Sequence, residues 1–359
     1  MAVQHTQIDQ NQVADVDPKD TLGRPIRDLR ISVLDRCNFR CPYCMPETKF
    51  HANYQFLKRQ ECLSYREIQR IASAAVGLGV TKLRLTGGEP LLDKKIPDLI
   101  ARLSKLSGVD DFALTTNGIL LADQAEALRS AGLHRITLSL DTLKADRFQA
   151  LTRFDELDAV LIGLDHATRI WPQSVKVDSV IIRGVNEDEV VSLLEHGRGL
   201  GAEVRFIEYM DVGGATRWSL DDVVPHTEII QLIEEHYGAI SPVNEQTSAP
   251  ADRYRLADGT TFGIISSTTA PFCRECDRSR LTADGLWYLC LYAQSGIDLR
   301  APLRAGASAD DLDALIRSAW NGRADRGAET RLATGDRQPL ISVEALQKQP
   351  HLEMHTRGG

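Results

Sequence analysis

Residues 29–44, LRISVLDRCNFRCPYC, join a short apolar run to three cysteines. The run LRISVLD (29–35) has the length and composition of a buried β-strand. Cys37, Cys41 and Cys44 follow it directly, at spacings of four and three residues. In α/β barrels, side chains that follow a strand form the active site. The stretch therefore predicts a strand that carries a thiol-based site at its carboxyl end.

The alternation of an apolar run with a helical stretch continues along the chain. Further apolar runs are KLRLTGGEP (82–90), DFALTTNG (111–118), RITLSLD (135–141), VKVDSVIIRG (175–184) and VRFIEYM (204–210). Helical periodicity is found near 64–78, 93–107, 122–131, 156–170 and 186–200. Strands that alternate with helices favour a parallel sheet or barrel with the helices outside. We therefore predict an α/β fold, an incomplete (β/α)6 barrel of the TIM type, over residues 22–215.

Polar and flexible residues gather where the expected strands end. Gly87–Pro90 end the second run and Thr116–Gly118 the third, while Ser139 and Asp141 lie at the fourth and Met210 at the sixth. Because active sites of such barrels lie at the carboxyl ends of the strands, we expect these residues to share one site with the three cysteines.

The remaining chain is expected to form two further parts. Residues 1–21 are polar and without pattern, which predicts a flexible leader. Residues 216–359 are expected to form a C-terminal segment with its own elements. These are a helix near 226–237, a hairpin YRLADGTTFGII with its turn at Asp258–Gly259, a turn at Asp284–Gly285 and a helix near 308–320.

Composition limits the class of protein and of partner. The 359 residues are 43% hydrophobic and 26% charged, as is usual for a soluble globular chain. No apolar run approaches the roughly 18 residues of a membrane span, and the first residues do not resemble a signal peptide, so we expect a cytoplasmic protein. The net charge of −8 argues against general binding to nucleic acid or to anionic membranes. A small-molecule ligand is therefore expected.

The cysteines form two groups. Cys273, Cys276 and Cys290 make the second, and Cys62 stands alone and is interpreted as a small buried hydrophobic residue. In a reducing compartment, clustered thiols indicate metal or redox sites rather than disulfides. Zinc requires four ligands, and His51 is the only histidine near the first group. Three thiolates instead suit an iron–sulfur cubane with one open iron. For the second group, the spacing also permits a zinc ribbon.

Cations interrupt the expected strands. Lys82 and Arg84 lie two residues apart, so both side chains point to one face, while the leucines between them face the helices. Arg30, Lys176 and Arg205 are placed similarly on other strands. If these five cations point into one cavity, that cavity requires an anionic ligand. A triphosphate remains possible, although no P-loop motif is present. The alternative is ion pairing with Asp178, Glu203 or Glu208.

Two levels of family resemblance follow from these motifs. CNFRCPYC together with the downstream GGEP resembles the radical S-adenosylmethionine superfamily. A wider set, which spans nearly the whole chain, resembles the GTP 3',8-cyclase family of molybdenum-cofactor biosynthesis: RPIRDLRISVLDRCNFRCPYCMP, KLRLTGGEPL, LTTNG, RITLSLD, RFIEYMD, FCRECDRSRLTADG and the terminal Gly-Gly. The resemblance implies two 4Fe–4S clusters, the second one in the C-terminal extension, with S-adenosylmethionine as cofactor and GTP as substrate.

The resemblance also implies roles for individual residues. The two clusters would be bound by Cys37, Cys41, Cys44, Cys273, Cys276 and Cys290. S-adenosylmethionine would contact Tyr43, Gly88, Ser139 and Met210. GTP would contact Arg30, Arg84, Thr115, Lys176, Arg205, Arg278 and Arg280, with Lys82 in the same basic cavity. The tail residues Gly358 and Gly359 would take part in catalysis, although by position alone they could be a frayed end.

Partners and rival functions complete the expectations. The resemblance implies an electron donor, the downstream cyclic pyranopterin monophosphate synthase, and a possible homodimer. Two rivals remain at this point. One is a radical enzyme that modifies peptides, and the other is an iron–sulfur or zinc protein without catalytic activity.

Overall fold

The computed structural model describes residues 17–244, 248–335, 337–349 and 352–357. Its strands form one twelve-stranded sheet with the order β12-β11-β10-β1-β2-β3-β4-β5-β6-β9-β8-β7. Neighbouring strands from β10 through β9 are parallel, and the outer pairs at each edge are antiparallel. The first six strands are β1 (Asp28–Ser32), β2 (Lys82–Thr86), β3 (Asp111–Thr116), β4 (Arg135–Ser139), β5 (Val175–Ile181) and β6 (Glu203–Glu208). The six predicted strands and their parallel arrangement are therefore confirmed.

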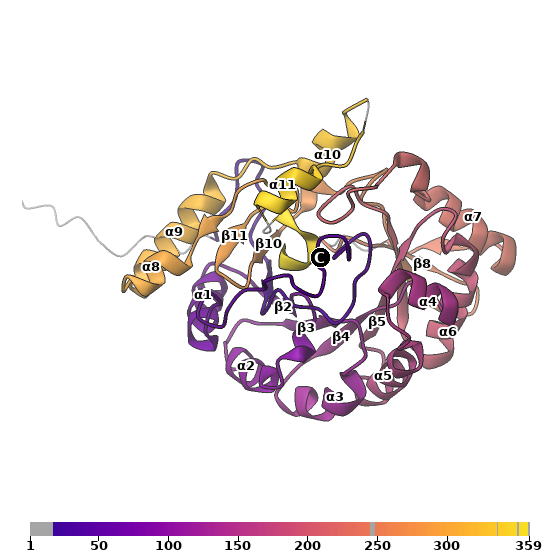
Figure 1. Cartoon of the computed structure of the whole chain (residues 1–359), viewed down its shortest axis with the longest axis horizontal. Helices are drawn as coiled ribbons and strands as arrows, with labels where there is room; N and C mark the ends of the chain where they lie inside the picture. Colours follow the sequence, from indigo (N-terminus) through magenta and orange to yellow (C-terminus); the bar gives the residue numbers. More distant parts are fainter. Residues whose placement is uncertain (1–16, 245–247, 336, 350–351, 358–359) are drawn as a thin grey trace, which may run out of the picture.

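Helices surround these strands on the outside (Figure 1). They are α1 (Tyr65–Gly77), α2 (Ile96–Leu103), α3 (Leu121–Ser130), α4 (Ala145–Thr152), α5 (Leu157–Ile170) and α6 (Val190–Leu200). Five correspond to predicted helical stretches. Ser64 begins α1 with a capping box in which its side chain and that of Glu67 each accept a backbone N–H of the other residue. The short helix α4 was not predicted.

The C-terminal segment extends the sheet at both edges. Strand β9 (Thr261–Ile265) lies parallel to β6, and β10 (Arg278–Leu281) lies parallel to β1. Eight adjacent parallel strands result, where the sequence predicts six. The incomplete barrel thus has two more parallel strands than expected, because strand β9 of the hairpin and the arginine-bearing strand β10 join the same sheet.

Further elements cover the edges of this sheet. They are α7 (His226–Tyr237), β7 (Ser241–Pro242), β8 (Asp252–Arg255), β11 (Leu286–Tyr288), β12 (Ile297–Asp298), α8 (Arg300–Arg304), α9 (Ala309–Asn321), α10 (Gly327–Leu332) and α11 (Val343–Lys348), with short 3-10 turns that include η4 (Cys273–Glu275) and η6 (Met354–Arg357). Strands β8 and β9 are the predicted hairpin, and α7 and α9 are the two predicted helices. In Figure 1 the yellow turn η6 lies over the middle of the ring of strands.

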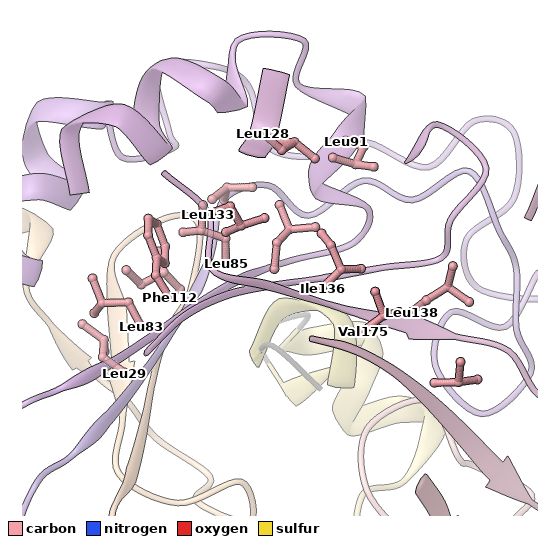
Figure 2. Packing of buried hydrophobic residues seen from close by; sticks show 14 of the residues in the cluster. Leu29, Leu83, Leu85, Leu91, Phe112, Leu128, Leu133, Ile136, Leu138 and Val175 are labelled. Carbon is pink, nitrogen blue, oxygen red and sulfur yellow. The ribbon is translucent and has the colours of Figure 1, made fainter. Parts of the chain in front are cut away.

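The hydrophobic core lies between the strands and the outer helices (Figure 2). Leu83 and Leu85 of β2 are almost fully buried there, together with Leu29 of β1. Arg84, which lies between these two leucines, and Arg30, which follows Leu29, point to the opposite face and line a cavity. The alternation predicted from the sequence is therefore confirmed, and it is what separates an apolar outer face from a charged inner face.

Two observations concern the ends of the chain and its helices. Residues 17–21, which the sequence assigns to a flexible leader, are packed against the C-terminal segment, where Asp20 is buried and Thr21 bonds to Arg323.

Across the described residues, every helix is too short or too polar to cross a membrane.

Candidate active site

A cavity opens at the carboxyl ends of the parallel strands, and both cysteine groups line it. All six clustered cysteines contribute, as do the four residues expected to contact S-adenosylmethionine, which are Tyr43, Gly88, Ser139 and Met210. Of the residues expected to contact GTP, those in the lining are Arg30, Arg84, Thr115, Arg205, Arg278 and Arg280. Lys176 and Lys82 are not part of the lining. Gly358 and Gly359 lie outside the described residues.

The first cysteine group is held in a compact loop after β1. The backbone N–H groups of Cys44 and Met45 donate to the carbonyl of Cys41, at 3.1 and 2.8 Å. Burial, together with the nearby Glu89, raises the pKa of the Cys37 thiol to about 12, and burial raises the pKa values of Cys41 and Cys44 as well. Thiolates are therefore unfavourable here without a compensating positive charge. A bound metal cluster supplies that charge, because metal coordination deprotonates thiols.

Gly88 is required by the packing of the chain itself. A Cβ atom at this position would lie 1.9 Å from the carbonyl oxygen of Arg36, one residue before Cys37. The neighbouring Gly87 has a φ of 147°, which a residue with a side chain rarely adopts. The family resemblance implies that Gly88 contacts S-adenosylmethionine. The structure adds that the two glycines allow the end of β2 to press against the cysteine loop.

Glu89 ties the ends of two strands together. Its buried carboxylate accepts hydrogen bonds from the backbone N–H groups of Leu91 and Asn117 and from the Thr116 hydroxyl, at 2.7 to 2.9 Å. Burial raises the pKa of Glu89 to about 7 despite these donors. The Asn117 side chain in turn lies 3.8 Å from the sulfur of Cys37. Glu89 thereby fixes the end of β3 beside the first cysteine group.

Tyr43 connects the cysteine loop to the opposite side of the cavity. Its hydroxyl donates to Asp141 at the end of β4, and its ring lies edge-to-face with Tyr209 at 6.5 Å. Asp141 also accepts from the backbone N–H of Val180, at 2.8 Å. Burial raises the pKa of Asp141 to about 6. Sequence reasoning placed Asp141 at a strand end but assigned it no role, since its partner lies 98 residues away.

In the second cysteine group, Cys273 begins η4, Cys276 follows it directly, and Cys290 lies on the loop after β11. Burial alone would raise the pKa of Cys276, but Arg278 and Arg323 more than offset it, and the pKa falls to about 7. Arg323 donates to the Cys276 sulfur at 3.4 Å. At Cys290, the backbone N–H of Tyr292 donates to the sulfur at 3.4 Å. Sequence reasoning did not identify Arg323, which lies 47 residues from its partner without a motif.

The arrangement of donors bears on the kind of metal site. In the parts of the chain that the structure describes, no three His, Cys, Asp or Glu side chains converge closely enough to bind one metal ion. A zinc ion needs four ligands around a single atom. In a 4Fe–4S cluster, by contrast, each thiolate binds a different iron, so the sulfurs are spread apart. Three cysteines match the three protein ligands of a 4Fe–4S cluster with one open iron, whereas a zinc ion would need a fourth ligand.

Three arginines form a row across neighbouring strands. Strand pairing places Arg30 of β1 directly between Arg84 of β2 and Arg280 of β10. Burial, and then repulsion from Arg280, lower the pKa of Arg30 to about 9, and burial likewise lowers that of Arg84 to about 9. All three guanidinium groups remain charged at neutral pH. An anionic ligand in the cavity would relieve the cost of burying them.

Ion pairing accounts for two other cations. Glu203 accepts from the Arg205 Nε at 2.8 Å, and the Lys176 Nζ lies 3.5 Å from the same carboxylate. Arg253 also approaches Glu203, at 3.0 Å. The alternative of ion pairing thus holds for Lys176 and Arg205, although Arg205 still lines the cavity.

Two residues of the C-terminal turn also line the cavity. Met354 and His355 belong to η6, and the ring of His355 meets that of Phe50 edge-to-face at 5.0 Å. Burial lowers the pKa of His355 to about 3, so its imidazole is neutral. Sequence reasoning assigned neither residue a role, because the position of the C-terminal segment over the barrel depends on contacts far apart in the chain.

Comparison with known families divides the chain into two matched parts. The family model described as the radical SAM superfamily matches residues 31–197, and the one described as Molybdenum Cofactor Synthesis C matches residues 202–329. The matched parts correspond to the incomplete barrel and to the segment that carries the second cysteine group.

Curated relatives extend over most of the chain. A protein named GTP 3',8-cyclase 3 from Mycobacterium bovis is 52% identical over 345 residues, which cover 95% of this chain and 90% of the relative. GTP 3',8-cyclase 1 from Mycobacterium tuberculosis is 50% identical over 345 residues, 95% of each protein. Among solved structures, Streptococcus suis SuiB bound to its precursor peptide SuiA matches with a TM-score of 0.60 at 15% identity, over 86% of this chain and 67% of that one. This last likeness is one of fold.

Proposed function

Since the chain belongs to the GTP 3',8-cyclase family, we propose that the cavity at the carboxyl ends of its strands is where S-adenosylmethionine is cleaved and GTP is cyclised. The observation that carries this proposal is the convergence of both cysteine groups and a row of buried arginines on one cavity. The enzyme belongs to the radical S-adenosylmethionine superfamily and uses an iron–sulfur cluster with S-adenosylmethionine. Its reaction is the first step of molybdopterin biosynthesis.

The reaction needs one radical initiator and one anionic substrate in contact. Cys37, Cys41 and Cys44 would hold the first cluster, which would supply the electron for reductive cleavage of S-adenosylmethionine into methionine and a 5'-deoxyadenosyl radical. The radical would take a hydrogen atom from C3' of GTP, giving 5'-deoxyadenosine, and C3' would then bond to C8 of the guanine. One further electron and one proton give (8S)-3',8-cyclo-7,8-dihydroguanosine 5'-triphosphate.

The loop after β1 would provide the first cofactor site. Cys37, Cys41 and Cys44 would bind the first cluster, and the raised pKa values of their thiols fit metal-dependent deprotonation. Around it, S-adenosylmethionine would contact Tyr43, Gly88, Ser139 and Met210, all of which line the same cavity. The hydrogen bond from Tyr43 to Asp141 ties the loop to the end of β4, which would help to position the loop for the cofactor.

The basic residues would bind the substrate. GTP would contact Arg30, Arg84, Thr115, Lys176, Arg205, Arg278 and Arg280. The triphosphate would offset the repulsion within the arginine row, and guanidinium groups suit phosphate oxygens because they donate in pairs. Fixing the triphosphate at one end positions C3' against the adenosyl C5'. To bind phosphate, the Lys176 amine would have to leave its ion pair with Glu203.

The second segment would complete the site. Cys273, Cys276 and Cys290 would bind a second 4Fe–4S cluster, whose open iron would hold the guanine end. We assign residues 22–215 to the partial barrel and 216–359 to the segment with the second cluster. Gly358 and Gly359 would enter the site from the tail, since glycine fits a narrow space.

Partners outside the chain follow from the same proposal. An electron donor supplies the reducing equivalents, and the product passes to cyclic pyranopterin monophosphate synthase. We place the enzyme in the cytoplasm and propose that it can form a homodimer.

A triple substitution tests the role of the second cysteine group. Replacing Cys273, Cys276 and Cys290 with alanine should halve the iron content, leave S-adenosylmethionine binding intact and stop GTP cyclisation. Cys62→Ala is the matched control, because Cys62 is a buried lone cysteine. Full formation of the cyclised product by the triple variant would refute the assignment.

A further inference from the structure

A buried group of charged residues lies behind the second cysteine group. Asp20 accepts from the Arg24 Nε at 2.5 Å, and its carboxylate is 3.6 Å from the Arg323 Nη1. All three side chains are at most 3% exposed. Asp20 and Arg24 come from the N-terminal segment and Arg323 follows α9. We call these three residues the Asp20 network.

The Asp20 network contacts Cys273, which begins η4, and Cys276, which follows it. Arg24 donates from Nη1 to the carbonyl of Cys273, at 2.7 Å. Arg323 donates from Nη1 to the carbonyl of Cys276 at 2.7 Å and from Nη2 to its sulfur at 3.4 Å. The two arginines therefore share a carboxylate but differ in one respect. At the cysteines, Arg323 contacts a sulfur, whereas Arg24 contacts a backbone carbonyl oxygen.

Packing keeps Arg323 in this position. Its guanidinium lies over the ring of Trp320, 4.5 Å from the centroid, and the indole N–H of Trp320 donates to the carbonyl of Arg24 at 3.0 Å. The backbone N–H and hydroxyl of Thr21 both donate to the carbonyl of Arg323. Few rotamers are open to a buried arginine held on so many sides, so its donors are preorganised toward Cys276.

The charge balance of the Asp20 network indicates its role. Among the buried side chains, two guanidinium groups face the single carboxylate of Asp20. The other acidic partner of Arg323 is Asp325, which is 39% exposed and lies 4.0 Å from the Arg323 Nε, so it offsets the buried positive charge next to Cys276 only in part. A buried excess charge is costly unless a partner compensates it. The thiolate of a metal-bound cysteine is such a partner, and Arg323 already donates to that sulfur.

We propose that Arg323 is a positioning residue for the second cluster, which it holds and makes easier to reduce through its hydrogen bond to the Cys276 sulfur. This inference rests on the proposed second cluster. Hydrogen bonds to the sulfur ligands stabilise the more negative, reduced state of an iron–sulfur cluster and so raise its reduction potential. Asp20 and Arg24 orient Arg323 and the η4 backbone.

The test isolates the second cluster in the full-length chain. Replacing Cys37, Cys41 and Cys44 with alanine removes the first cluster, so that iron content and the midpoint potential followed by electron paramagnetic resonance report only the second. In this parent protein, Arg323→Met should shift the midpoint potential to a more negative value. Arg24→Met is the matched comparison, because it removes the other buried partner of Asp20 and a hydrogen bond to the Cys273 carbonyl without removing a donor to sulfur, and it should shift the midpoint less than Arg323→Met. Arg323→Lys, which keeps a charge and a donor, should give a smaller shift than Arg323→Met.

Each result decides the question. Equal midpoints in the parent, Arg323→Met and Arg323→Lys proteins would overturn the inference, as would an equal shift in Arg24→Met, which would indicate a structural effect of the whole network. If circular dichroism shows that Arg323→Met does not fold, Arg323→Lys decides in the same way. A parent protein that binds no iron would refute the second cluster itself, which separates failure of the proposed function from failure of this inference.

Discussion

At the scale of single residues, the buried arginines are the feature that needs an explanation. Arg30, Arg84 and Arg280 lie side by side on three strands, and burial lowers the pKa of each. In an isolated protein this arrangement opposes folding, because like charges repel and water is excluded. It becomes favourable when a polyanion binds. We therefore expect the arginine row to bind an anion and to cost stability in the free protein.

The first prediction concerns the two arginines of β10. Replacing Arg278 and Arg280 with alanine should weaken GTP binding by roughly 30-fold or more, because a charge-assisted hydrogen bond contributes about 2 kcal/mol. Binding of S-adenosylmethionine should change much less. Calorimetric titration of each ligand measures the difference, and Arg255→Ala, an exposed arginine on β8, is the control. Equal losses for both ligands would contradict the assigned role.

The second prediction concerns pH and Lys176. Burial, followed by repulsion from Arg205, lowers the pKa of Lys176 to about 8, while Glu203 and Asp178 act in the opposite direction. Only the protonated amine attracts phosphate, so GTP affinity should be highest below pH 8 and should fall as the pH rises through 8. An arginine at this position would stay charged, so the variant Lys176→Arg should show a flatter profile between pH 7 and about 8.5, below the pKa of about 9 of Arg30 and Arg84. A flat profile for the unaltered protein would mean that Lys176 keeps Glu203 and does not contact GTP.

At the scale of elements, local pattern predicted much of the fold. The six strands and five of the helices show clear periodicity, and the hairpin of β8 and β9 contains an Asp-Gly turn. Pairing between distant segments has no such local signal. Strand β10 lies beside β1 although about 250 residues separate the paired Asp28 and Arg278, and the sequence does not indicate which edge it joins. The eight-residue helix α4 was missed because it carries little more than two turns of pattern.

The candidate site shows the same division. Motif residues such as Cys37 and Arg84 could be identified because their type and spacing are unusual. Arg323 and Asp141 could not, since arginine and aspartate are common and their roles depend on partners brought close only by the fold.

The third prediction concerns the contact between β2 and the cysteine loop. Gly88→Ala places a Cβ 1.9 Å from the Arg36 carbonyl, so the loop must move. We expect loss of iron from the first cluster and destabilisation by more than about 3 kcal/mol, measured by iron analysis and denaturant unfolding. Gly199→Ala is the matched control, because a Cβ in that helix meets nothing within 4 Å. It should stabilise the protein by up to about 1 kcal/mol. An unchanged iron content in Gly88→Ala would show that the contact is not needed.

At the scale of the whole molecule, the C-terminal segment closes over the barrel. Glu353, whose side chain is fully buried, pairs with Lys49 of the loop that follows the first cysteine group. Arg357 lies over the ring of Tyr288, 4.2 Å from its centroid, and donates to the carbonyl of Leu291 at 2.6 Å. These contacts fix the last described residues at the cavity, where Met354 and His355 form part of its wall. Both cysteine groups are thereby enclosed in one site.

The fourth prediction concerns the tail. Deleting Gly358 and Gly359 should leave iron content and the binding of both ligands unchanged, because Glu353 and Arg357, which anchor the described end of the chain, stay in place. The turnover number should fall by at least about tenfold, which corresponds to a catalytic barrier raised by at least about 1.4 kcal/mol. Lys49→Ala is the companion variant. It removes the ion pair with Glu353 but keeps the two terminal glycines, so it should reduce turnover less. Unchanged turnover after the deletion would remove the tail from the mechanism.

The most direct test of the central claim uses protein purified and reconstituted without oxygen. Iron is counted per chain, and then reductant and S-adenosylmethionine are added with and without GTP, while 5'-deoxyadenosine and cyclised nucleotide are measured. Two four-iron clusters predict about eight irons per chain, with deoxyadenosine formed in step with the 3',8-cyclised triphosphate. About eight irons and deoxyadenosine with GTP left unchanged would contradict GTP cyclisation in this cavity.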